Sequence, residues 1–309
     1  MATAKVFFLA APATSALFLV LGLGTLSARQ DKLNPHQPVP ATNLVLAPKI
    51  TLRGNPPRPA GGGSRRRAAA TGVLGALCNG AKYAIVAGIS DYPGVRNDLE
   101  YADDDAIDMA KVLEMTYGFP VDRILLLVDH EATRANIMGA IEALGARATA
   151  DDEVVFFFSG HGMSGVAADG DHERRDEAIV TYHPLSLAPL WDGELREAFR
   201  DFQTNRIIFI FDICMAGGMN DLQAPGRVIL MAAPERGYAY EGDEWGHGEL
   251  TYYLMEGVVT GAANTHDYGF RVLSEPALVT AEQAFDYTRT NCTWDRPVIG
   301  DSFPDDLLP

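Results

Sequence analysis

Two residues in glycine-containing segments of this sequence carry side chains that could cleave a peptide bond together. The first is His161 in the segment SGHG, and the second is Cys214 in the segment DICMAGG. A free thiol is mostly protonated at neutral pH, and a nearby imidazole can accept its proton and later return it to a leaving amine. The pair therefore predicts nucleophilic acyl transfer, with His161 and Cys214 as a catalytic dyad.

The glycines beside both residues support the same chemistry. They let a peptide chain approach closely and leave backbone N–H groups available to bind an oxyanion. The predicted oxyanion donors are the N–H groups of Gly162 and Cys214. Taken alone, a cysteine after a strand is usually a small core residue. It is the occurrence of both motifs after strong apolar runs that favours catalysis.

Apolar runs typical of buried strands lead into both motifs. Residues 154–158 (VVFFF) precede the histidine, and residues 207–211 (IIFIF) precede the cysteine. Further strands are predicted at 83–88, 123–128 and 228–232, and helices at 99–117, 131–146, 192–202 and 248–259. Strands that are apolar on both faces and alternate with helices indicate an α/β fold, with a mostly parallel central sheet and helices on both faces. Functional groups gather at the carboxyl ends of such strands, so neighbouring strands would bring the two motifs together.

The charge of the chain narrows the choice of partners. The 309 residues include 25 Lys and Arg and 41 Asp and Glu, which gives a formal net charge of −16. Asp31 is the single acid before residue 81, so a basic leader precedes a strongly acidic body. An acidic body attracts basic peptides or divalent metals, and it argues against nucleic acid as a partner. No phosphate loop follows the first predicted strand, so a nucleotide-dependent enzyme is not indicated.

The N-terminal quarter has a different composition from the body. After Lys5, residues 6–26 are almost entirely apolar. We expect residues 1–28 to be a signal peptide or a membrane anchor, so that the body is exported, whether secreted or periplasmic, or anchored by this segment. Residues 29–80, rich in Pro, Gly and Arg, are expected to be a linker with no fold before about Ala81. Residues 81–309 are expected to form the catalytic domain.

The segments FFFSGHG and FDICMAGG together resemble the caspase-like cysteine peptidases, in particular metacaspase-type and bacterial members. The segments YAIVAGISDY, LEYADDDA, DEAIVTY and GELTYYLMEGV agree, so the resemblance runs from about Lys82 to the C-terminus. It implies a caspase–haemoglobinase fold and an endopeptidase that cuts peptide or protein substrates after Arg or Lys. The implied pocket for the basic side chain consists of Asp105, Ser159 and Asp212. Carboxylates suit this role because a desolvated cation needs a charged partner.

The resemblance also implies a candidate calcium site, although the acyl transfer itself requires no cofactor. Its carboxylates map onto Asp176, Asp192 and Asp221. The fourth position is Gly193, which removes a ligand from a cation that prefers six to eight oxygens.

One departure from the family pattern leaves an alternative open. The family commonly has His-Ser after the cysteine, whereas this chain has Met215 and Ala216. The alternative is a weak or inactive caspase-like scaffold or interaction module. If the enzyme is active, the arginines at 65–67 and 174–175 are candidate self-processing sites, because exposed loops are the preferred positions for cleavage.

Overall fold

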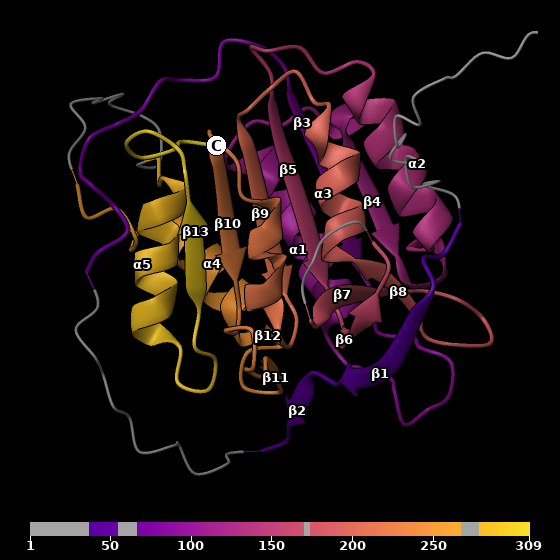
Figure 1. Cartoon of the computed structure of the whole chain (residues 1–309). Helices are drawn as coiled ribbons and strands as arrows, with labels where there is room; N and C mark the ends of the chain where they lie inside the picture. Colours follow the sequence, from indigo (N-terminus) through magenta and orange to yellow (C-terminus); the bar gives the residue numbers. More distant parts are fainter. Residues whose placement is uncertain (1–36, 55–66, 170–173, 267–277) are drawn as a thin grey trace, which may run out of the picture. The chain divides into compact units, whose positions relative to one another are not determined.

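The computed structural model describes residues 37–54, 67–169, 174–266 and 278–309 (Figure 1). The expected signal peptide or anchor, residues 1–28, lies outside the described residues. Within the part that is described, no helix is long and apolar enough to cross a membrane.

A six-stranded sheet in the order β13-β10-β9-β5-β3-β4 forms the centre of the structure. Its strands are β3 (Lys82–Gly88), β4 (Ile124–Val128), β5 (Glu153–Ser159), β9 (Ile207–Asp212), β10 (Arg227–Met231) and β13 (Val298–Asp301). Every neighbouring pair is parallel except β10 and β13, which are antiparallel. The predicted mostly parallel sheet is confirmed, and β13 is an added antiparallel edge strand.

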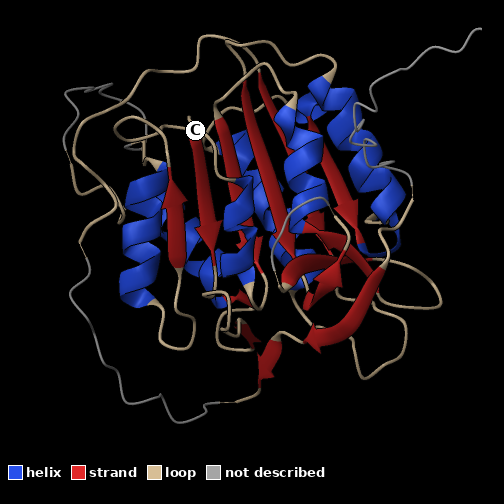
Figure 2. Ribbon diagram, viewed as in Figure 1, coloured by secondary structure: helices blue, strands red, loops and turns tan. Residues whose placement is uncertain are grey.

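Helices cover both faces of this sheet (Figure 2). Helices α2 (Arg134–Gly145) and α3 (Asp192–Arg200) pack on one face, together with Phe156 and Phe158 of β5. Helices α1 (Ala102–Met115), α4 (Glu249–Val259) and α5 (Ala281–Asn291) pack on the other face, together with Phe157. Successive residues of β5 thus enter opposite cores, which is why the sequence of this strand is apolar without interruption.

Two smaller sheets lie near the carboxyl ends of β5 and β9. The first has the order β1-β6-β7-β8, formed by β1 (Ala41–Ala47), β6 (Gly162–Ala167), β7 (Asp176–Thr181) and β8 (Ala188–Trp191). The second has the order β12-β11-β2, formed by β12 (His247–Gly248), β11 (Tyr240–Gly242) and β2 (Ile50–Leu52). Figure 1 shows β1 and β2 in indigo beside β6 and β11.

Strands β1 and β2 correct one expectation. The prediction of no fold before about Ala81 is wrong for residues 41–52, because these residues pair with the edges of β6 and β11. Ladder hydrogen bonds and buried side-chain contacts offset the entropy of ordering a segment whose own composition is that of a linker.

Candidate active site

The two predicted catalytic segments leave adjacent strands at one edge of the sheet. Strands β5 and β9 are parallel neighbours, and Ser159 pairs with Asp212 at their carboxyl ends. His161 and Cys214 each follow two residues later. Gly162 packs so closely on Cys214 that a Cβ at this glycine would overlap the Cys214 carbonyl oxygen. The backbones that carry both predicted oxyanion donors are therefore in contact.

The His161 ring is held in one orientation and one tautomer. Its Nε2 lies 2.7 Å from the carbonyl oxygen of Asn97, which can only accept, so Nε2 carries the proton and Nδ1 is the acceptor. Tyr92 stacks on the ring at a centroid separation of 4.6 Å and accepts a hydrogen bond from the His161 N–H. Burial lowers the pKa of His161 to about 4, so the ring is neutral at physiological pH.

The Cys214 thiol is buried and protonated in this state. Burial raises its pKa to about 12, although the N–H of Ala239 donates to the sulfur at 3.1 Å. The next residue, Met215, has a left-handed backbone with φ of 59°. A non-glycine residue in this region is strained, and such strain is common at functional turns.

The peptide group between Pro48 and Lys49 contacts both predicted catalytic side chains. The N–H of Lys49 donates to Nδ1 of His161 at 3.1 Å, and the Cys214 thiol donates to the carbonyl oxygen of Pro48 at 3.2 Å. Strands β1 and β2 flank this peptide and fix it in place. The histidine and the cysteine therefore face one shared peptide group, which covers them both.

The three predicted pocket residues come together around the side chain of Lys49. The Lys49 ammonium lies 2.8 Å from Asp212 Oδ1, 3.4 Å from Asp105 Oδ2 and 3.0 Å from the Ser159 hydroxyl oxygen. Both ion-paired side chains and the lysine are fully buried. Ser159 in turn donates to Asp105 Oδ2 at 2.7 Å. The acidic pocket is thus assembled, and it contains a basic side chain.

The protonation states in the pocket follow from burial and charge. Burial opposes the charge on Lys49, but Asp212 and Asp105 raise its pKa above the ordinary value. Burial would raise the pKa of Asp105, but Lys49 and the hydrogen bond from His247 hold it below its usual range. Burial raises the pKa of Asp212 in spite of Lys49. The ammonium is therefore the group that stabilises two buried carboxylates at close range.

Several residues of this pocket were not identified from the sequence. Lys49 falls within residues 29–80, which the composition predicts to be a linker. His247, Gly248 and Thr251 contact the two aspartates, and they come from the turn into α4. Gly248 and Thr251 both lie in the segment GELTYYLMEGV, which supports the family resemblance, so that segment is the signal in the sequence that could have identified them.

Of the predicted calcium ligands, Asp192 and Asp221 lie close enough for their charges to interact. The N–H of Gly193 donates to the carboxylates of both Asp192 and Asp169. Asp169 is not among the ligands predicted from the sequence. Burial raises the pKa of Asp192 to about 9, and the negative charges of Asp169, Asp221 and Glu177 add to the effect. Oδ2 of Asp176 accepts the N–H of Ala167 at 2.7 Å. Among the described residues, Asp192 Oδ2 is buried without a hydrogen-bond donor, and the all-carboxylate donor set suits a hard cation.

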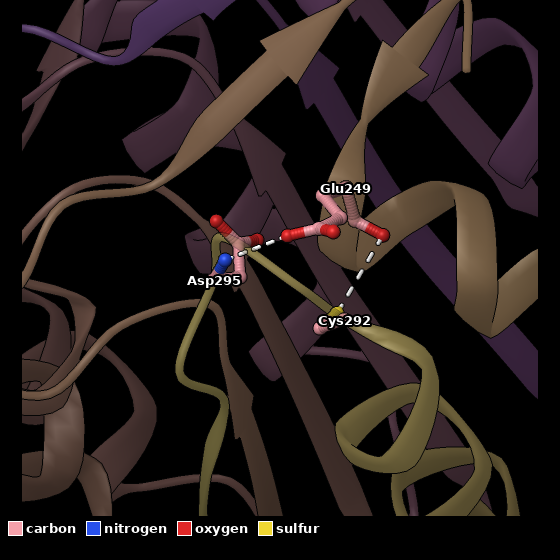
Figure 3. Close-up of side chains that lie close together, drawn as sticks. All are labelled: Glu249, Cys292 and Asp295. Atoms are coloured by element: carbon pink, nitrogen blue, oxygen red, sulfur yellow. Dashed lines mark hydrogen bonds between the residues drawn. The ribbon is translucent and has the colours of Figure 1, made fainter. Parts of the chain in front are cut away.

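A second cluster lies close to the start of α4, formed by Glu249, Cys292 and Asp295 (Figure 3). Backbone N–H groups donate hydrogen bonds to both of its carboxylates. Glu249 accepts the N–H groups of residues 293–295, and Asp295 accepts those of Tyr240 and Leu250. These bonds fix β11 and the first turn of α4, which border the acidic pocket. We therefore assign this cluster to positioning the pocket rather than to metal binding.

Comparison with known proteins identifies the family. A family model described as the caspase domain matches residues 81–274, which include both His161 and Cys214. The chain is similar to Metacaspase-1 of Saccharomyces cerevisiae, with 30% identity over 154 residues that cover 47% of this chain and 35% of that protein. It is similar to Metacaspase-3 of Arabidopsis thaliana, with 32% identity over 202 residues that cover 60% of this chain and 50% of that protein. The chain therefore spans half or less of the length of these relatives.

A solved structure supports the fold. A protein from Geobacter sulfurreducens matches with a TM-score of 0.54 at 16% sequence identity, over 74% of this chain and 95% of that one. At this identity the match speaks for architecture alone, and the architecture agrees with the predicted caspase–haemoglobinase fold. The chain belongs to the caspase-domain family, and metacaspases are among its relatives.

Proposed function

We propose that this protein is a cysteine endopeptidase that uses His161 and Cys214 to cleave peptide bonds after basic residues. The observation that carries the proposal is the buried ammonium of Lys49 between Asp212 and Asp105, beside the dyad. A pocket that already holds an alkylammonium in this chain can hold the same group of a substrate. Peptides or proteins with basic residues are the proposed partners, and the net charge of −16 speaks against nucleic acid.

The proposed reaction begins when a substrate carbonyl carbon replaces the peptide that covers Cys214. His161 Nδ1 accepts the thiol proton, and the sulfur forms a bond to the carbonyl carbon. The N–H groups of Gly162 and Cys214 stabilise the resulting oxyanion. His161 then gives its proton to the leaving amine as the peptide C–N bond breaks. Water, deprotonated by the same imidazole, attacks the thioester and releases the carboxylic acid and the free thiol.

The covering segment makes this arrangement a resting state. The thiol is protonated and donates to the carbonyl oxygen of Pro48. It does not contact the carbonyl carbon of Lys49, which would be the point of attack for cleavage after this lysine. A substrate must displace residues 41–52 to reach the sulfur, and we propose that this segment acts as an internal competitor. Its Lys49 is held in the pocket without being presented for cleavage.

Self-processing remains part of the proposal, with candidate sites at the arginines of residues 65–67 and 174–175. Arg65 and Arg66 lie outside the described residues, whereas Arg174 and Arg175 are exposed. Mass spectrometry of the purified chain beside its Cys214→Ala variant tests this idea. Identical fragments from both proteins would show that another protease made the cuts.

Calcium is proposed as a structural ligand of this enzyme. Asp192, Asp169 and the partly exposed Asp221, which pairs with Arg196, would hold it, and its charge would offset the repulsion that raises the pKa of Asp192. The cation would support the β7–β8 and α3 region and takes no step in the proton transfers. Export or anchoring through residues 1–28 is likewise proposed from the sequence.

The alternative is a caspase-like scaffold without catalysis, and the specific observation behind it is Met215 in place of the family's histidine. Fluorogenic peptides that differ only in Lys, Arg or Asp before the scissile bond separate the two functions. We expect cleavage after a basic residue and none by Cys214→Ala. Faster cleavage after Asp refutes the pocket assignment, and no cleavage with any peptide favours the scaffold.

A further inference from the structure

The acidic pocket presents one oxygen of each carboxylate to its occupant. Asp212 Oδ1 and Asp105 Oδ2 face the Lys49 ammonium. The remaining oxygens are engaged by the turn into α4. Asp212 Oδ2 accepts the hydroxyl of Thr251 at 2.7 Å and its N–H at 3.1 Å. Asp105 Oδ1 accepts the N–H of Gly248 at 3.0 Å.

Three single acceptors around one nitrogen match an ammonium better than a guanidinium. A lysine presents three donors from one atom. Here the ammonium donates hydrogen bonds to Asp105 Oδ2 and the Ser159 hydroxyl, and it forms an ion pair with Asp212 Oδ1. An arginine binds most strongly when both oxygens of one carboxylate accept two parallel N–H groups. Neither aspartate can offer that arrangement while its second oxygen is held by the α4 turn.

The end of the pocket also limits the length of the side chain. A Cβ built on Gly248 would lie 2.5 Å from the Lys49 Nζ and would overlap Asp212 Oδ2. Gly248 has φ of −64° and ψ of 144°, which any residue adopts, so the backbone does not require glycine here. What the glycine provides is space, and the ammonium already uses it. An arginine side chain is longer by one bond and ends in a planar group.

We propose that this pocket selects lysine over arginine at the residue before the scissile bond, with Gly248 and Thr251 as the residues that determine the selection. The selection among substrates rests on the proposed function, because it requires that the protein cleave peptides. The preference of the pocket itself is a binding property, because Lys49 already fills it in this chain.

The catalytic arm of the test compares two fluorogenic peptides that are identical except for Lys or Arg before the scissile bond. We expect kcat/KM to be at least about tenfold higher for the lysine peptide. In Thr251→Val, which retains the shape of the side chain but removes the hydroxyl donor, the ratio should move towards arginine. Equal or faster cleavage of the arginine peptide by the unaltered protein overturns the inference.

The binding arm needs no activity. In the Cys214→Ala background, Lys49→Arg replaces the occupant of the pocket, and hydrogen exchange of residues 41–52 reports how firmly the segment is held. We expect exchange at least about tenfold faster in Lys49→Arg than with the native lysine, and no change for Lys111→Arg on the exposed face of α1. Exchange that is unchanged or slower in Lys49→Arg overturns the inference. Absence of cleavage in the first arm would count against the proposed function, while this arm would still decide the selectivity of the pocket.

Discussion

Replacement of Lys49 by methionine should release the segment that covers the active site. Methionine keeps much of the volume of the lysine stem and removes the charge. The side chains of Lys49, Asp105 and Asp212 are fully buried, so the change leaves two carboxylates without their shared cation. Breaking a buried ion pair in this way costs about 3–5 kcal/mol.

This cost applies to the covered state alone, because the carboxylates are solvated once the segment has left. At about 1.4 kcal/mol for each factor of ten, the population of the uncovered state should rise between about 100-fold and about 4,000-fold. We expect the lower end, because burial already raises the pKa of Asp212 and a bound proton can replace part of the lost charge. The ladder bonds of β1 and β2 remain in either case.

The assay is alkylation of Cys214 by iodoacetamide, followed by mass spectrometry of the peptides. Cys78 is half-buried and distant in sequence from the dyad, so its rate serves as an internal reference. Lys111→Met, which removes an exposed lysine, is the matched control variant. The reasoning is refuted if Cys214 reacts no faster in Lys49→Met than in the unaltered protein while Cys78 reacts equally in both.

Three further outcomes follow from the same geometry. The alkylation rate of Cys214 in the unaltered protein should rise about tenfold per pH unit until about pH 12, because the thiol is buried. In Lys49→Met the rate should level off near the ordinary thiol pKa, close to 9. Superimposable pH profiles of the two proteins would contradict this. Asp105→Asn should lower kcat/KM for lysine peptides by at least about 30-fold, because one of the two charges that bind the cation is lost, and unchanged kinetics would remove Asp105 from the pocket. Asp192→Asn should abolish any increase in melting temperature on addition of calcium, which at 100 times the Kd corresponds to about 2.7 kcal/mol in the unaltered protein; an equal increase in both proteins would exclude this site.

The central strands, and the sheet edge at which His161 and Cys214 lie, could be predicted from the sequence because their signals are local. Strand β5 is buried on both faces, so VVFFF is apolar without a break, and β9 behaves in the same way. The parallel fold then brings the residues that follow both strands to one edge. Helix α5 was missed even though Thr280 and Gln283 form a capping box at its start.

The covering segment could not be predicted from local patterns. The sequence around Pro48 has the composition of a linker, and its order arises from contacts distant in the chain. Lys49 bonds to His161 across 112 residues, and Cys214 bonds to Pro48 across 166 residues. The acidic charge of the body did indicate an affinity for basic peptides, but nothing local identified one of this chain's own lysines as the occupant.

The most direct test of the active site is covalent labelling by a peptide ketone that ends in lysine, compared with the same ketone ending in aspartate. The Lys49→Met variant is used so that the pocket is accessible. We predict that the lysine probe labels Cys214 and that the additional change His161→Ala prevents it, because the thiol then has no base to accept its proton. Equal labelling by both probes, or labelling of Cys214 that persists without His161, would contradict the proposed pocket and dyad.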